Sequence, residues 1–316
     1  MKKLNKLSVG ALALVTALAA APVAAQQLTF MTGPQGGVWV PLGGALKGMW
    51  EKAIPGLQIT ATPGAGIANV RGINENKAQI GMSNSSSAVD GLLGKAPFKE
   101  KTTKVCQLAN LYPQLFQVVA TKSANVNSFM DLKGKRLVTQ SKGNTGEALT
   151  AMILDMNGMS YKDLARANFQ ASYTDAVSMM KDGHVDVFTL GTTAPASSVM
   201  DLANSREVNL VPVDDATMKK MRDVNPAYNK IMIKAGTYPG QTTDVPVIGY
   251  YTHVIVSCEL PENTVYQMTK VMAENIPSMI AVSRAMEGLD AKTMASEMGL
   301  PMHPGALKYY KEVGAL

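Results

Sequence analysis

The chain has 316 residues, of which 17% are charged, and a formal net charge of +6. Three lysines belong to the export signal described next, and without them 27 basic and 24 acidic residues remain, a net charge of about +3. This mild excess is scattered and contains no basic run, so the sequence argues against a nucleic-acid partner.

The first 25 residues have the pattern of a cleavable secretory signal. A start rich in lysine precedes an apolar stretch from Leu7 to Ala21, and small residues follow at Val23 to Ala25. The stretch is shorter than the roughly 20 apolar residues that a membrane anchor needs. No later segment is long and apolar enough to span a bilayer. We therefore expect cleavage near Ala25 and an exported protein.

A glycine-rich segment, Gly33 to Gly44, follows a strand-like run from Leu28 to Thr32. Glycine lets backbone N–H groups approach a ligand closely, and Pro41 is tolerated in the first turn of a helix. Free N–H groups at a helix start favour anions. The segment therefore predicts a strand, a loop and a helix start built to hold a small ligand.

Short apolar strands then alternate with helical patterns along the chain, which predicts an α/β protein with largely parallel sheets. The apolar spacing predicts a helix over Gly146 to Asn157 and helices through the tail from Pro261 to Leu316. Further strands are expected at Gln58–Ala61, Gln79–Ser83, Val105–Leu111, Phe116–Thr121, Arg136–Gln140, Val185–Leu190 and Val208–Val213.

Two polar breaks divide the chain. About 290 residues beyond the signal exceed one typical core, and the breaks fall at Lys122 to Gly134 and Gly236 to Asp244. The strand-like run from Val245 to Cys258 would then return the chain to the first lobe. We predict one lobe from residues 26–122 and 253–316 and another from 123–252, joined by two crossings.

The only two cysteines, Cys106 and Cys258, both lie in strand-like runs. Export to an oxidising compartment permits a disulfide between them. Two buried free thiols are the alternative, and the sequence does not choose between the two.

Five loops rich in small polar residues each stand between a strand and a helix start. Ligands of open α/β sheets bind beyond the carboxyl ends of the strands, so these loops are expected to meet at one cleft, although each alone could simply cap a helix. Lys142 and Arg71 are the cations in or near the loops, and whether either contacts a ligand stays open. The candidate ligand-binding residues are Gly37, Val38, Trp39, Gly66, Asn84, Ser85, Tyr112, Asn144, Thr145, Gly146, Thr189, Gly191 and Thr192.

Enzyme signatures fail when they are checked one at a time. The three histidines form no metal-binding array, and Ser178 to Lys181 matches Ser-x-x-Lys without its companion motif. Gly64 to Asn69 resembles the start of a dinucleotide loop but lacks its third glycine. We expect no enzyme activity, no catalytic residue, no cofactor and no metal.

The loops, in this order, resemble the TAXI family of solute-binding proteins, the receptors of one class of tripartite ATP-independent periplasmic (TRAP) transporters. The resemblance covers nearly the whole exported chain. Its motifs are Gly36-Gly37-Val38-Trp39-Val40-Pro41-Leu42-Gly43-Gly44, Pro63-Gly64-Ala65-Gly66-Ile67-Ala68-Asn69-Val70, Asp131-Leu132-Lys133-Gly134-Lys135-Arg136, Ala235-Gly236-Thr237-Tyr238-Pro239-Gly240-Gln241 and His303-Pro304-Gly305-Ala306 with Tyr309-Tyr310.

This resemblance implies a periplasmic receptor with a type II periplasmic-binding-protein-like α/β fold. Two lobes joined by crossing hinge strands would close on a small organic anion, such as glutamate or a related dicarboxylate. The receptor would act as a monomer and deliver its ligand to the TRAP permease subunits in the membrane. A sensor that presents its ligand to a membrane kinase, or a secreted hydrolase using Ser85 or Ser178, remains an alternative.

Departures from the family pattern bear on the ligand. Val38, Trp39 and Val40 stand where the family has threonine and two tyrosines, so a hydroxyl donor is lost and the wall enlarged. Asn84-Ser85-Ser86 replaces Gln-Ser-Asp, and Gly143-Asn144-Thr145-Gly146 replaces Gly-Ser-Gly-Thr. Glutamate should therefore not be assumed.

Overall fold

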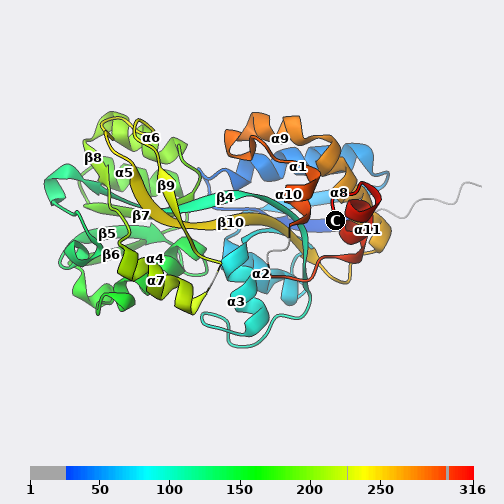
Figure 1. The fold of residues 1–316 in the computed structure, drawn as a ribbon, viewed down its shortest axis with the longest axis horizontal. Coiled ribbons are helices and arrows are strands. Elements are labelled where there is room, and N and C mark those ends of the chain that lie inside the picture. Colours follow the sequence, from blue (N-terminus) through cyan, green and yellow to red (C-terminus); the bar gives the residue numbers. More distant parts are fainter. Residues whose placement is uncertain (1–25, 226, 297–298) are drawn as a thin grey trace, which may run out of the picture.

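The computed structural model describes residues 26–225, 227–296 and 299–316. The predicted signal at residues 1–25 lies outside this part of the chain. The molecule is elongated, with helices gathered at its two ends and two long strands, β4 and β10, running between them (Figure 1). Two α/β lobes joined by crossing strands are thus present, as the sequence indicated, whereas the exact lobe boundaries stay a prediction.

One mixed sheet of ten strands runs through both lobes in the order β2-β1-β3-β10-β4-β7-β5-β6, with β8 paired to β4 and β9 to β10. The prediction of largely parallel sheets was wrong for the centre, because β10 and β4 pair antiparallel with each other and with their neighbours. The strands are β1 Gln26–Met31, β2 Leu57–Thr62, β3 Ile80–Asn84, β4 Val105–Thr121, β5 Arg136–Gln140, β6 Arg166–Gln170, β7 Val187–Thr192, β8 Val208–Leu210, β9 Asn229–Ile233 and β10 Val245–Ser257.

Helices cover both faces of each half of the sheet (Figure 1). In the first lobe, α1 and α8 to α11 lie on one face and α2 and α3 on the other, and in the second lobe α5 and α6 lie opposite α4 and α7. The helices are α1 Trp39–Ala53, α2 Gly66–Asn74, α3 Ser85–Leu93, α4 Thr145–Met156, α5 Tyr173–Lys181, α6 Ser197–Ser205, α7 Asp215–Val224, α8 Glu262–Glu274, α9 Ile276–Val282, α10 Ala291–Ala295 and α11 Pro304–Glu312. Short 3-10 turns lie at Lys122–Ala124, Phe129–Leu132, Tyr161–Asp163 and Arg284–Met286.

The crossing strand β4 is longer than predicted. The two runs expected at Val105–Leu111 and Phe116–Thr121 form one strand of 17 residues, because the residues between them, Tyr112 to Leu115, pair with β10. Its beginning packs in the core of the first lobe, and its end, including Phe116, packs with α4 and α7 in the second. The sequence also missed β6 and β9, which are short and half exposed.

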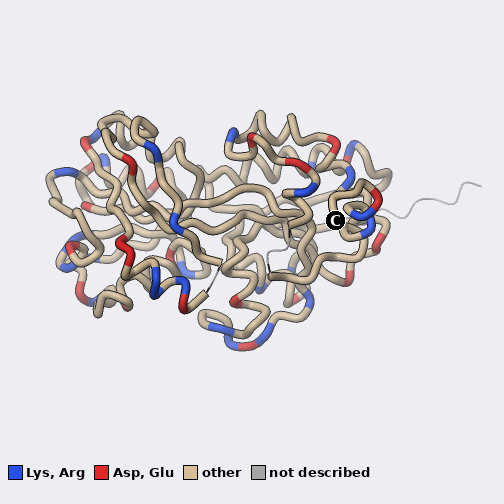
Figure 2. Tube along the Cα trace, in the orientation of Figure 1, with Lys and Arg blue, Asp and Glu red and all other residues tan. Residues whose placement is uncertain are grey.

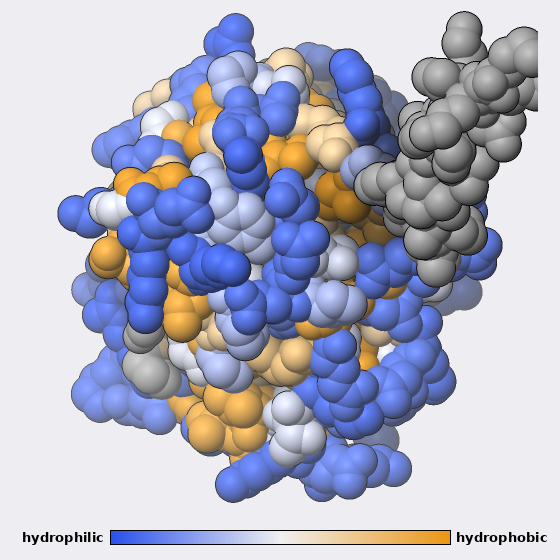
Figure 3. All heavy atoms as spheres, turned by 90° about the vertical axis from the view of Figure 1, so that its right-hand side faces the viewer, coloured by the Kyte–Doolittle hydropathy of each residue, from blue (hydrophilic) through white to orange (hydrophobic). Residues whose placement is uncertain are grey.

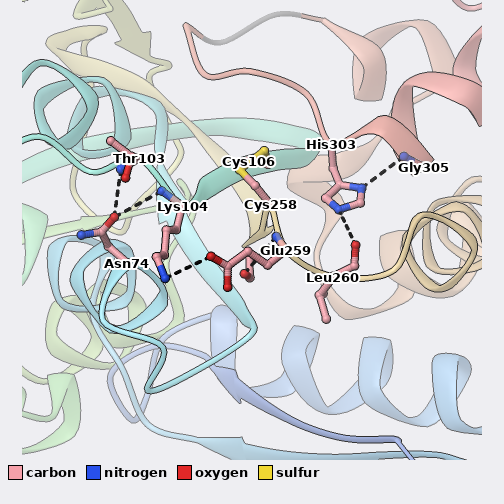
Figure 4. The surroundings of a disulfide bond; sticks show 10 residues. Asn74, Thr103, Lys104, Cys106, Cys258, Glu259, Leu260, His303 and Gly305 are labelled. Atoms are coloured by element: carbon pink, nitrogen blue, oxygen red, sulfur yellow. Dashed lines mark hydrogen bonds and ion pairs between the residues drawn. A yellow bond between two sulfur atoms is a disulfide. The ribbon is translucent and has the colours of Figure 1, made fainter.

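Cys106 and Cys258 form a disulfide that links β4 to the residue after β10 (Figure 4). Nearby, Lys104 forms an ion pair with Glu259 at 3.0 Å. His303 fixes the start of α11 in the same region, because its Nδ1 accepts from the N–H of Gly305 and its Nε2 lies 3.0 Å from the carbonyl of Leu260. These links join the end of the first lobe to its crossing strands.

Candidate ligand-binding site

A small cavity lies between the lobes, where both crossing strands and several helix starts meet. Its empty volume is about 360 Å³, which includes solvent space at its mouth. Its lining residues are Pro34, Gly37, Val38, Trp39, Gly66, Asn84, Tyr112, Gln114, Asn144, Thr145, Tyr173, Gly191, Thr192 and Tyr250.

Five helices begin at this cavity. Trp39, Gly66, Thr145 and Tyr173 are the first residues of α1, α2, α4 and α5, and Asn84 precedes α3. The positive ends of their backbone dipoles therefore point towards one place. Helix starts of this kind favour a negatively charged group.

No lysine, arginine, histidine, aspartate or glutamate belongs to the lining residues of the described chain. The polar groups that face the cavity are amides, hydroxyls and the indole of Trp39. Charged residues of both signs are spread over the two ends of the molecule, with few near its middle (Figure 2). Recognition here must come from neutral hydrogen-bonding groups and helix ends.

The crossing strands contribute Tyr112, Gln114 and Tyr250 to the lining. When the Gln114 amide is oriented to satisfy its neighbours, its oxygen accepts from Trp39 Nε1 at 2.8 Å and from Thr252 Oγ1 at 2.7 Å. Its nitrogen then donates to the carbonyl of Gly191 at 3.2 Å. Gln114 thus ties a first-lobe helix start to a second-lobe strand end.

One phenol group in the cavity has no protein partner. The hydroxyl of Tyr250 is buried without a hydrogen-bond partner among the described residues, whereas that of Tyr112 lies beside the side chains of Thr252, Trp39 and Gln114. Burial raises the pKa of both tyrosines well above the usual value, so both keep their proton. The Tyr250 hydroxyl lies so close to Gly191 that a Cβ atom there would come within 1.9 Å of it. The buried O–H of Tyr250 is thus available to a ligand.

The lobes are in contact around the cavity, so the structure is a closed one. Asn84 Nδ2 donates to Thr145 Oγ1 at 2.8 Å, and Ser87 Oγ lies 2.9 Å from the same oxygen. The backbone of Ala68 donates to the carbonyl of Gly143 at 3.0 Å. Each of these bonds joins a residue of the first lobe to one of the second.

A second contact between the lobes lies outside the cavity. Asn225, directly after α7, donates from Nδ2 to Asp90 Oδ1 at 3.0 Å and to the carbonyl of Ser86 at 3.2 Å. Burial, opposed by the hydrogen bond from Asn225, raises the pKa of Asp90 to about 6. Closure therefore removes a carboxyl group from water.

The structure brings together ten of the thirteen residues that the sequence suggested, and three lie outside the lining. Ser85 Oγ accepts from the N–H of Tyr251 at 3.2 Å, and Thr189 Oγ1 lies 2.8 Å from Thr150 Oγ1. Gly146 packs against Gln140, whose oxygen would be 1.9 Å from a Cβ atom there. The side chains of Ser85 and Thr189 bond to protein atoms, and Gly146 is closely packed against a side chain. These three residues therefore support the lining and do not form part of it.

Neither candidate cation lines the cavity. Arg71 donates to the carbonyl of Pro97, and its guanidinium lies 5.1 Å from the centre of the Phe98 ring. Arg71 thus contacts the segment after α3. Lys142 precedes Asn144 in the loop before α4 and is not among the lining residues.

Sequence reasoning missed Pro34, Gln114, Tyr173 and Tyr250. Gln114 and Tyr250 lie inside the crossing strands, where no glycine or loop composition marks them. Tyr173 opens α5, and its hydroxyl donates to the carbonyl of Gly191 at 2.8 Å. The signal that could have found it is Ser172 followed by Asp175, a pattern typical of a helix start.

The part of the chain that the structure describes contains no group of three or more histidine, cysteine or acidic side chains suited to a metal ion. No helix in that part is both long and apolar enough to cross a membrane. The face around the C terminus is mostly hydrophilic, with hydrophobic residues in separate small areas (Figure 3).

This architecture is the type II periplasmic-binding-protein fold, with its cavity between the lobes. The phosphonate-binding protein PhnD1 of Prochlorococcus marinus, solved with methylphosphonate, superimposes with a TM-score of 0.54 at 13% identity, covering 92% of this chain and 99% of that one. The periplasmic binding protein BugD gives a TM-score of 0.54 at 11% identity, covering 92% and 98%. Residues 30–314 match the family model of the NMT1-like family, and the chain belongs to that family.

Proposed function

We propose that this protein is an extracytoplasmic receptor that captures a small organic anion by closure of its lobes. The observation that carries the proposal is the cavity itself, where five helix starts and the unpartnered hydroxyl of Tyr250 surround a space whose described lining residues are all uncharged. Such a site supplies donors and positive dipole ends, which are what an anion needs. The structural likeness to a protein solved with methylphosphonate, itself a small anion, supports this direction.

Closure makes binding selective for a ligand that contacts both lobes. Trp39 and Asn84 belong to the first lobe, and Thr145 and Thr192 to the second. A ligand shifts the open and closed populations only by its differential affinity for them. Hydrogen bonds to a charged group contribute about 1.5 to 3 kcal/mol each, so three or four could support micromolar binding after the cost of association.

We further propose that the receptor delivers its ligand to a TRAP permease, as the resemblance to the TAXI family suggests. The ligand classes that follow from this resemblance are glutamate-like amino acids and dicarboxylates. The small, neutral cavity supports binding and release without turnover, because no nucleophile with a basic partner lies among its lining residues.

The test is titration calorimetry on protein stripped of carried-over ligand by unfolding and refolding. A panel of carboxylates, phosphonates and sulfonates should contain at least one anion with micromolar affinity, and the compound should be recovered unchanged. The absence of any binder at millimolar concentration would overturn the proposed receptor function. Uptake assays in vesicles reconstituted with a TRAP permease test delivery separately.

A further inference from the structure

We infer that the bound anion carries no ammonium group, so the site takes carboxylic acids of the oxo, hydroxy or unsubstituted kind and rejects amino acids. This inference rests on the proposed receptor function and narrows its ligand class. It follows from an asymmetry between the donors and acceptors that surround the cavity.

Among the described residues, the cavity lining contains no aspartate or glutamate that could pair with a ligand ammonium. The buried acids on the neighbouring helices have other partners, since Glu147 accepts from the Tyr161 hydroxyl at 3.0 Å and Asp90 accepts from Asn225. An ammonium held here would be a buried charge without a counter-charge, which is strongly unfavourable.

The positive ends of the helices strengthen the asymmetry. The starts of α1 to α5 surround the cavity, and their dipoles favour negative charge and disfavour positive charge. A carboxylate gains from this field, whereas an ammonium opposes it. A zwitterionic amino acid would have to place one group favourably and the other against the same field.

The unpartnered polar atoms of the lining offer little to an ammonium. The hydroxyl of Tyr250 is protonated and can donate, and Asn84 Oδ1 is the one unpartnered buried amide oxygen among the lining atoms described. The other end of the Asn84 amide already donates to Thr145. One amide oxygen accepts at most two hydrogen bonds, whereas an ammonium brings three N–H donors. The structure therefore assigns Tyr250 as an anion donor and Asn84 as an acceptor for a ligand hydroxyl.

Matched ligand pairs test the inference by calorimetry. The pairs are 2-oxoglutarate and 2-hydroxyglutarate against glutamate, malate against aspartate, and lactate against alanine. For whichever carbon skeleton binds, the acid without nitrogen should bind at least 100-fold more tightly. Equal or tighter binding of the amino acid overturns this inference and leaves the receptor function standing. No binding by any anion of the wider panel overturns both.

One variant and a matched control test the assigned donor. Tyr250→Phe should weaken binding of the preferred anion by about 10- to 100-fold, without lowering the Tm of the ligand-free protein, because the lost hydroxyl has no partner among the described residues. Tyr310→Phe is the matched control, since its buried hydroxyl donates to the carbonyl of Leu108 at 3.1 Å, away from the cavity. It should lower the Tm and leave the affinity unchanged. Unchanged affinity in Tyr250→Phe would contradict the assignment.

Discussion

At the scale of single residues, the polar groups that lack protein partners are the most informative. Tyr250 presents its hydroxyl to the cavity, where a ligand can form a hydrogen bond with it. His253 is fully buried on β10 near the backbone of Asn84, but it does not line the cavity. Burial of His253 affects stability, whereas burial of the Tyr250 hydroxyl affects binding.

Stability at acid pH should depend on His253. Burial lowers the pKa of its imidazole to about 3, whereas in the unfolded chain it is about 6.5. Between these values the unfolded chain binds a proton that the folded protein does not, so the free energy of unfolding falls as the pH falls below 6.5. Between pH 6.5 and pH 4.5 the unsubstituted protein should lose about 2 kcal/mol of unfolding free energy through His253. The His253→Leu variant should not show this part of the loss.

Urea unfolding of His253→Leu and the unsubstituted protein at several pH values measures this difference. His184→Leu is the control, because it makes the same substitution at a histidine that is exposed on the surface. Parallel curves for His253→Leu and the original protein would show that the buried ring is not responsible.

At the scale of secondary structure, the two crossing strands hold the lobes together and supply part of the cavity lining. β4 and β10 pair over most of their lengths, and the disulfide joins them in the first lobe. The cysteines are 152 positions apart in the chain. A covalent link across so long a loop restricts the unfolded chain considerably.

Removal of this link should destabilise the protein without changing its site. We expect the double variant Cys106→Ser, Cys258→Ser to lose roughly 4 kcal/mol of unfolding free energy. Ligand affinity should remain, because neither cysteine lines the cavity. Denaturant unfolding and calorimetry measure the two quantities, and an unchanged unfolding midpoint would contradict the expectation.

The start of α2 controls how closely the lobes approach. A Cβ atom on Gly66 would lie 2.4 Å from Thr145 Oγ1 and 2.8 Å from Asn84 Nδ2. These atoms form the hydrogen bond that joins the lobes. Gly66→Ala should therefore oppose closure and weaken ligand binding by roughly 10- to 100-fold, equivalent to about 1.4 to 2.8 kcal/mol.

Small-angle scattering with saturating ligand and calorimetry test Gly66→Ala. Its unfolding free energy without ligand should change little, because the lobes can remain apart. Gly44→Ala is the matched control within helix α1, since a Cβ atom there meets nothing within 4 Å. If Gly66→Ala closes and binds like the original protein, the close contact at Thr145 does not limit closure.

At the scale of the whole molecule, closure is coupled to protonation of Asp90. Its carboxyl is buried against Asn225 of the other lobe, and burial raises its pKa to about 6, above the value of an exposed aspartate. The closed form therefore binds protons more readily than an open form in which this carboxyl meets water. This contribution to closure is present at low pH and is lost as the pH rises through about 6.

Affinity for the ligand should thus increase by up to about tenfold between pH 7 and pH 5 through Asp90. The ligand affinity of the Asp90→Asn variant should not show this increase between pH 7 and pH 5. Calorimetry on both proteins at each pH with the same compound measures the difference and cancels the ligand's own titration. An identical pH response in the two proteins would exclude Asp90 as its source.

Much of the candidate site could be predicted because its loops have a distinctive composition. Glycine and small polar residues between a strand and a helix mark a place where backbone must approach something closely, and ten lining residues were found in this way or through the family resemblance. Ser85, Gly146 and Thr189 share that composition but point into protein. Composition identifies a loop, whereas the direction of a side chain depends on its neighbours.

By itself, the sequence determined the α/β class, the two-lobed organisation and most of the loops around the cavity, because local spacing and composition encode them. The tertiary structure alone decided that β4 and β10 pair antiparallel, that the cysteines join and that Tyr250 and Gln114 face the cavity. These features depend on contacts between residues far apart in the chain. Local patterns do not show which distant strand will pair with a given strand. They therefore do not show which buried hydroxyl is left without a protein partner and can bind a ligand.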